Sequence, residues 1–153
     1  MSFLLLSILV AIAANIIISD IKERKISNAW VLLNFAVCLT LALLLDVFPI
    51  WQGLLVSLVT FVIGLGLFRF KILGAGDIKL LMGYSVCFSF SLALTNLIEF
   101  LLVGGVIVVA QLGWAYITAG FTELKKRGVP YGIAIASVSV FNIGCLVFGK
   151  AGL

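Results

Sequence analysis

The chain has 153 residues, of which 64% are hydrophobic and only 10% are charged. A soluble domain usually carries about 25% charged residues, so this composition excludes an ordinary soluble protein and indicates an integral membrane protein. The net charge is +4, but the basic residues form separate clusters between long uncharged runs, which does not fit a nucleic-acid-binding surface. The chain has no histidine, and Cys38, Cys87 and Cys145 lie in apolar runs without Cys-x-x-Cys spacing. We therefore expect no metal, no disulfide and no cofactor, and we interpret the cysteines as small buried hydrophobes.

Six stretches of the chain contain no Asp, Glu, Lys or Arg. In chain order they are residues 2–19, 26–45, 47–68, 80–98, 100–122 and 128–149. Each is close to the length of about 20 residues that a membrane-spanning helix needs. The sequence therefore predicts an all-α membrane protein with six transmembrane helices. Residues 1–153 form one domain, with no room for a soluble one.

The distribution of basic residues predicts how these helices are oriented. Nine of the ten Lys and Arg residues fall in or beside the odd-numbered connections: Lys22, Arg24, Lys25, Arg69, Lys71, Lys79, Lys125, Lys126 and Arg127. The even-numbered connections, near Asp46 and Glu99, contain none. Because Lys and Arg are enriched in cytoplasmic loops, the odd connections are predicted to be cytoplasmic. Both termini then lie outside a multi-pass protein of the cell membrane.

Two aspartates stand where an apolar run meets a predicted cytoplasmic loop. They are Asp20 and Asp77, and the second closes the tetrapeptide Gly-Ala-Gly-Asp at residues 74–77. An ionisable group at such a place is costly and is a functional candidate by default. Without histidine, the chemistry that remains is a pair of carboxylates sharing a water, one ionised to accept a proton and one protonated to donate. The alternative is that Asp77 only N-caps a helix and Asp20 only ends one.

Neighbouring features predict how these two aspartates are positioned and which of them is the acid and which the base. Gly74 and Gly76 are expected to take unusual φ values and to let another chain approach the backbone closely. Asp77 would open a helix, where the helix dipole favours a negative charge, whereas Asp20 would end one. The dipole therefore predicts that Asp77 ionises first and is the base, with Asp20 as the acid, although Lys22 and Lys25 oppose this order.

Three segments together resemble the type IV prepilin peptidases, which are membrane aspartic proteases with a Gly-x-Gly-Asp motif. The segments are DIKERKISN at residues 20–28, GAGDIK at residues 74–79 and VPYG at residues 129–132. The resemblance spans essentially the whole chain and implies that Asp20 and Asp77 are catalytic. It implies an intramembrane aspartic endopeptidase that removes the short basic leader of a prepilin-like substrate at the cytoplasmic face. The implied partners are that membrane protein and the lipid bilayer, with no nucleic acid and no cofactor.

The chain also departs from the usual pattern of that family. Ser27 stands where members usually have proline, which is expected to loosen the entry to the second helix. The paired Cys-x-x-Cys motifs of the larger members are missing. The chain is therefore similar to the short peptidases of Flp/Tad pilus systems or of archaeal preflagellins, and N-methyltransferase activity is not expected. The particular prepilin and the oligomeric state are left open.

Several other polar and small residues have more than one interpretation. Lys79 either shapes the site, by holding a carboxylate ionised or contacting the substrate backbone, or snorkels to the interface. Glu23 either engages the leader or is a solvated loop carboxylate. Asn15 and Asn96 are expected to join helices by hydrogen bonds, and four glycines are expected to be close-packing sites: Gly64, Gly66, Gly104 and Gly105.

A function from a different class remains as the alternative. In a small membrane transporter or a non-catalytic membrane scaffold, the same carboxylates would bind a cation or stabilise packing. An internal repeat or paired broken helices at the bilayer midplane would favour transport. The sequence has neither, and both aspartates are predicted at one face.

Overall fold

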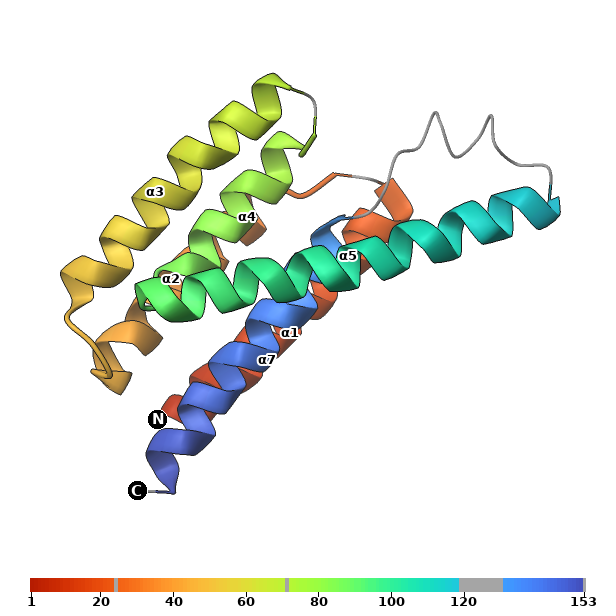
Figure 1. Cartoon of the computed structure of the whole chain (residues 1–153). Coiled ribbons are helices and arrows are strands. Elements are labelled where there is room, and N and C mark those ends of the chain that lie inside the picture. Colours follow the sequence, from red (N-terminus) through yellow and green to blue (C-terminus); the bar gives the residue numbers. More distant parts are fainter. Residues whose placement is uncertain (24, 71, 119–130, 153) are drawn as a thin grey trace.

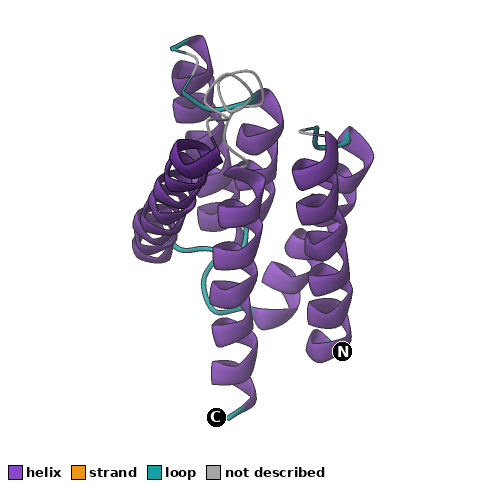
Figure 2. Cartoon of the chain, turned by 90° about the vertical axis from the view of Figure 1, so that its right-hand side faces the viewer, coloured by secondary structure: helices purple, strands orange, loops and turns teal. Residues whose placement is uncertain are grey.

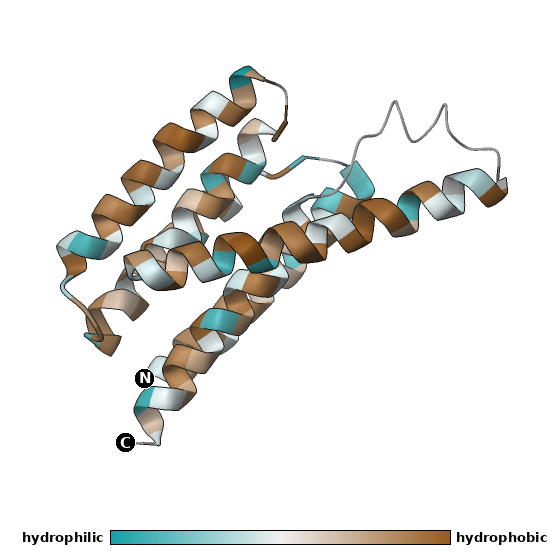
Figure 3. Ribbon diagram, in the orientation of Figure 1, coloured by the Kyte–Doolittle hydropathy of each residue, from teal (hydrophilic) through white to brown (hydrophobic). Residues whose placement is uncertain are grey.

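The computed structural model describes residues 1–23, 25–70, 72–118 and 131–152, and all regular elements in these ranges are helices (Figure 2). They are α1 (Ser2–Glu23), α2 (Asn28–Leu45), α3 (Ile50–Arg69), α4 (Ala75–Ser85), α5 (Phe90–Thr118) and α7 (Tyr131–Ala151). Hydrophobic residues predominate along the long helices (Figure 3). Five of these helices, all except α4, are long and apolar enough to cross a membrane. The prediction of an all-α, multi-pass membrane protein is therefore confirmed in this coarse form.

The first three predicted spans correspond to α1, α2 and α3, and local side chains fix the turns between them. Ser19 Oγ donates a hydrogen bond to the carbonyl oxygen of Lys25, at 2.8 Å, across the turn after α1. Ser27 is the N-cap of α2, and its Oγ accepts a hydrogen bond from the backbone N–H of Ala29. A side-chain cap of this kind stabilises a helix start. The expectation that Ser27 loosens the entry to this helix is therefore wrong.

The predicted fourth and fifth spans have the wrong boundaries. Residues 80–98 are divided between α4 and α5, because the chain turns after Ser85 and α5 starts only at Phe90. At 11 residues, α4 is about 16 Å long, roughly half the thickness of the hydrocarbon core. Glu99, which was assigned to a loop, lies inside α5, where its carboxylate accepts a hydrogen bond of 2.6 Å from Asn142 on α7. Because the Glu99 carboxylate has a hydrogen-bond partner, it is tolerated within α5. The charge of Glu99 therefore did not mark the end of a helix.

The short helix α4 enters the bundle at the end where α2 and α7 begin. The first half of α5 then returns toward that same end. At its start α4 lies beside the start of α2, since Lys79 donates a hydrogen bond to Asn28. The turn after α4 reaches the middle of α2, where the Cys87 thiol donates to the backbone carbonyl of Cys38. Further on, Gly104 of α5 packs against Tyr131, the first residue of α7. The path of α5 crosses the other helices obliquely and extends beyond them (Figure 1).

As a result, both chain termini lie at one end of the bundle (Figure 1). The rings of Phe3 on α1 and Phe148 on α7 are 5.4 Å apart there. Asp20 and Gly132 meet at the opposite end of the same two helices. The number of membrane crossings and the side on which the termini lie stay predictions.

The core surrounds α4, which contacts α2, α3 and α7. Leu80 and Tyr84 of α4 are fully buried. Small residues allow this close packing: Gly64 of α3 lies against the side chain of Ile78, as expected for a close-packing site. In contrast, a Cβ placed on Gly66 or Gly105 would meet no atom of the described residues within 4 Å, so the close-packing prediction is wrong for these two within that part of the chain.

Polar side chains join α5 to α7 within the apolar bundle. Asn96 donates a hydrogen bond to Ser139, and Asn142 donates to both Asn96 and Glu99. The prediction that Asn96 joins helices is thus confirmed. Asn15 instead donates to the carbonyl of Ala11 in its own helix, so the same prediction is wrong there.

The orientation predicted from the basic residues leads to a labelling result. We expect cysteines introduced at Ser2 and Gly152 to react with an impermeant maleimide added to intact spheroplasts. A cysteine at Lys25, which is exposed beside the aspartates, should react only after the membrane is opened. Cys145 is exposed on α7 rather than buried as expected, so a Cys145→Ser background is appropriate. Labelling in the reverse order would place the aspartates outside and contradict the orientation.

Candidate active site

Asp20 lies in the last turns of α1, with only 6% of its surface exposed. Gly132, the second residue of α7, faces it. A Cβ placed on Gly132 would lie 2.7 Å from Asp20 Oδ2 and 3.0 Å from its Cγ. The absence of a side chain at Gly132 is therefore what makes room for this carboxylate.

Asp77 is the third residue of α4, and it is half-buried. Its Oδ2 accepts a hydrogen bond of 3.2 Å from the backbone N–H of Gly74, which is the N-cap residue. Asp77 therefore accepts a hydrogen bond from a backbone N–H at the start of α4. It is not itself the N-cap residue, which the interpretation of Asp77 as a mere helix cap required. This bond holds the carboxylate in place at one oxygen.

The two aspartates, 57 positions apart in the sequence, are brought close enough to interact. The pKa of Asp77 is raised from its usual value of 3.8 to about 6: burial contributes most, the negative charge of Asp20 raises the pKa as well, and the hydrogen bond from the Gly74 N–H lowers it. The helix dipole predicted the opposite direction for Asp77. Its effect of about 0.3–1 kcal/mol is smaller than that of removing a carboxylate from water next to another carboxylate.

Ile26, in the turn after α1, connects the surroundings of the two carboxylates. A Cβ on Gly76, next to Asp77, would lie 3.2 Å from Ile26 Cβ, and one on Gly132, against Asp20, would lie 3.2 Å from Ile26 Cδ1. One side chain thus packs against both glycines. It fixes the separation of α4 and α7 where the aspartates meet.

Of the two reasons expected for glycine at positions 74 and 76, the structure supports close approach of another segment at Gly76 and does not support unusual φ values. Neither residue has φ in the left-handed region, so backbone freedom does not explain them. Gly76 is required by its contact with Ile26. A Cβ on Gly74 would lie 3.0 Å from Asp77 Oδ2, so glycine leaves space beside this carboxylate.

Lys79 lies one helical turn beyond the start of α4 and is half-buried. Its Nζ donates a hydrogen bond of 3.1 Å to Asn28 Oδ1, at the start of α2. This bond ties α4 to α2 at the level of the aspartates. A role toward the substrate remains a prediction.

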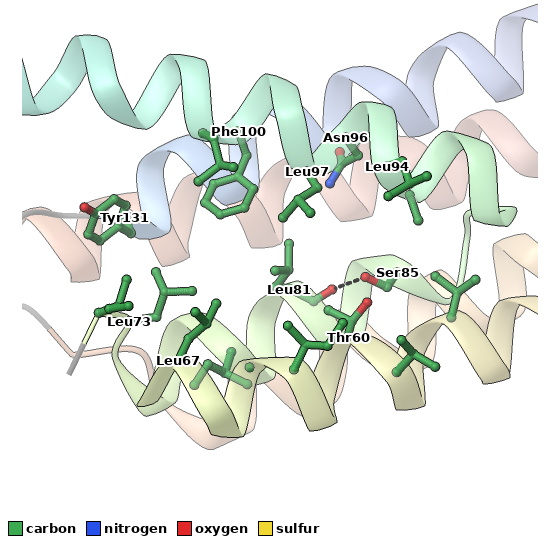
Figure 4. Close-up of a pocket in the computed structure, with 18 of the residues that line it drawn as sticks. Thr60, Leu67, Leu73, Leu81, Ser85, Leu94, Asn96, Leu97, Phe100 and Tyr131 are labelled. Atoms are coloured by element: carbon green, nitrogen blue, oxygen red, sulfur yellow. Dashed lines mark hydrogen bonds between the residues drawn. The ribbon is translucent and has the colours of Figure 1, made fainter. Parts of the chain in front are cut away.

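An apolar groove leads away from the aspartates between α3 and α5, with α4 as its floor (Figure 4). Its volume is about 450 Å3. Tyr131 and Leu73 lie at one end, and Leu94 and Ser85 lie toward the other. Among the described residues, no group of three His, Cys, Asp or Glu side chains lies close enough together to hold a metal ion.

A comparison with protein families decides the class of this site. The family model described as the type IV leader peptidase family matches residues 4–110 of the chain. The chain belongs to the type IV leader peptidase family. The chain is therefore a protease of the prepilin-type leader peptidase kind. The comparison with curated proteins and the comparison with solved structures gave no match.

The match to the leader peptidase family includes both aspartates and the Gly-Ala-Gly-Asp segment, but it ends before α7. Gly132 and Ile26 are the residues of this leader peptidase whose roles sequence reasoning missed. The glycine of Val-Pro-Tyr-Gly was noticed as part of a motif, without a contact to explain it. Ile26 is one of many isoleucines, and only the folded chain distinguishes it.

Proposed function

We propose that this leader peptidase is an aspartic endopeptidase in which Asp20 and Asp77 activate a water. Its substrate is a prepilin-like membrane protein, from which it removes a short basic leader at the cytoplasmic face. The observation that supports this most strongly is the meeting of two carboxylates from α1 and α4, coupled so that the charge of Asp20 raises the pKa of Asp77. Such coupling is typical of a catalytic pair of carboxylates.

The raised pKa of Asp77 supports placing the starting proton on that residue. In the first step the Asp20 carboxylate accepts a proton from water while the water oxygen bonds to the carbonyl carbon, and the Asp77 carboxyl gives its proton to the carbonyl oxygen. The product is a tetrahedral diol. In the second step Asp20 passes its proton to the amide nitrogen as the C–N bond breaks, and Asp77 takes one hydroxyl proton back. The pair again holds one proton, and the products are a carboxylic acid and an amine.

Charge supports the cytoplasmic location of this chemistry. Four basic residues lie near helix ends on the same side of the bundle as the aspartates: Lys22, Lys25, Arg69 and Lys79. Lys150, in contrast, lies at the opposite end, in the last turn of α7. Basic residues are enriched on the cytoplasmic side of membrane proteins. The proposed location is the cell membrane, and the proposed substrates are those of Flp/Tad-type or preflagellin-type systems.

Cleavage of a defined substrate tests the proposal. The purified protein, in liposomes, is incubated with each co-encoded prepilin candidate, and the products are identified by mass spectrometry. We expect one cut between the basic leader and the hydrophobic segment, unaffected by EDTA. A protein that inserts normally but cuts none of these substrates contradicts the proposed function.

The position of the shared proton leads to a second measurable prediction. In carboxyl-carbon NMR of labelled Asp77, we expect a midpoint near pH 6, with the protonated form below it. Because the charge of Asp20 contributes to this value, Asp20→Asn should move the midpoint toward 3.8. The pH dependence of kcat/KM should follow: activity falls as pH rises above about 6, where Asp77 loses its proton. A midpoint at or below 3.8 in the unmodified enzyme would reverse the assignment of acid and base.

A further inference from the structure

The apolar groove between α3 and α5 is continuous with the surroundings of both aspartates. Three pairs of consecutive residues make this connection. Leu73 lines the groove while Gly74 bonds to Asp77, Ile78 lines it next to Asp77, and Tyr131 lines it next to Gly132. Each pair therefore contributes one residue to the groove and one to the carboxylate site. A molecule lying in the groove would have its end at the aspartates.

The walls of the groove suit the face of a helix. Thr60 of α3, Ala93 of α5 and Ser85 of α4 are small residues among larger aliphatic ones. Within a membrane, helices associate through close packing at small residues, because lipid provides no hydrophobic driving force between them. A volume of about 450 Å3 accommodates the side chains along one face of a helix rather than a whole helix.

The groove also lies where the bundle is open. Wall residues Ile63 and Leu94 are 60% and 62% exposed. Because α3 and α5 make few direct contacts, the groove is not closed between these two helices.

We propose that this groove is the docking site for the hydrophobic transmembrane helix of the prepilin-like substrate. The proposal rests on the proposed function, which supplies a membrane-anchored substrate. The bound helix lies against α3 and α5, and the chain N-terminal to it emerges at Leu73 and Tyr131, so that the scissile bond reaches Asp20 and Asp77. The groove thus selects substrates by their hydrophobic segment.

Photocrosslinking tests this docking with matched positions on each wall. Benzoylphenylalanine is placed at Thr60 or Leu97, which line the groove, and at Leu58 or Ile98, which are exposed nearby on the same helices but do not line it. The enzyme carries Asp77→Asn so that bound prepilin is not cut. We expect substrate crosslinks from residues 60 and 97 and few from residues 58 and 98. Equal crosslinking at all four positions, or crosslinks from residues 60 and 97 to lipid alone, would overturn the docking proposal.

Kinetics of groove-filling variants provide a second readout in the active enzyme. Thr60→Trp and Leu97→Trp should each raise KM for full-length prepilin about tenfold, as expected from losing the packing of one large side chain. Leu58→Trp and Ile98→Trp should leave it near the unmodified value. An enzyme that cuts prepilin but shows no difference between the two pairs refutes the groove while leaving the proposed function intact. If the unmodified enzyme cuts no prepilin, both the groove proposal and the proposed function are refuted.

Discussion

Asp20→Asn and Asp77→Asn are each expected to reduce leader cleavage about 1,000-fold or more, because an amide keeps the shape of the carboxyl group but neither accepts nor returns the proton. Asp77→Asn removes the carboxyl whose raised pKa supplies the first proton. Asp20→Asn removes the partner that takes the proton of water. The measurement is the initial rate of prepilin cleavage in liposomes, with equal amounts of inserted enzyme.

The double variant distinguishes a catalytic pair from two independent contributions. Residues that act as one unit are not additive, so Asp20→Asn combined with Asp77→Asn should be little slower than either single variant. Glu23→Gln is the matched control, since Glu23 is an exposed carboxylate near the end of the same helix as Asp20. Near-normal cleavage by either single variant would exclude the proposed dyad.

Gly132→Ala is expected to lower kcat about 100-fold, the order of loss that a displacement of about 1 Å causes at a reacting group. The added Cβ would lie 2.7 Å from Asp20 Oδ2, so the carboxylate must move. Gly132 is a positioning residue in this account, because it acts through Asp20. The rate of cleavage and the KM are measured on full-length prepilin, and KM should change much less than kcat.

Gly144→Ala is the matched control on the same helix, since a Cβ placed there meets nothing within 4 Å. A further readout separates positioning from general damage to α7. Movement of Asp20 should shift the NMR midpoint of Asp77 in Gly132→Ala, because the charge of Asp20 contributes to that pKa. An unchanged midpoint together with a normal rate would show that the contact with Gly132 does not position the Asp20 carboxylate.

Much of the fold was predictable because uncharged runs and helix length are strong indicators in a membrane protein. The prediction succeeded for α1, α2 and α3, where a charged loop follows or precedes each helix. It was wrong for the segment around α4 and α5, because no charge marks the turn after Ser85 and because Glu99 was assumed to lie in a loop. The carboxylate is instead paired with Asn142, 43 positions later, and such a partner is not visible from local sequence.

The candidate site was predictable to the level of its two aspartates and not to the level of their environment. Asp20 and Asp77 stood out because acidic residues are rare in this chain. Gly132 and Ile26 act through contacts between distant segments, and the pKa of Asp77 depends on burial and on Asp20, which outweigh the local helix dipole. The sequence favoured the dipole because neither the burial of Asp77 nor its distance from Asp20 can be evaluated from local sequence.

The position of Gly132 on α7 has a consequence for biogenesis. Asp20 belongs to α1 and Asp77 to α4, both of which are synthesised before α5, but the wall against Asp20 comes from α7, the last described helix. A nascent chain that has inserted only α1 to α5 therefore has both carboxylates without the contact that positions one of them. In the proposed mechanism the complete site forms only when α7 packs along α1, so proteolytic competence requires α7 and is not acquired helix by helix.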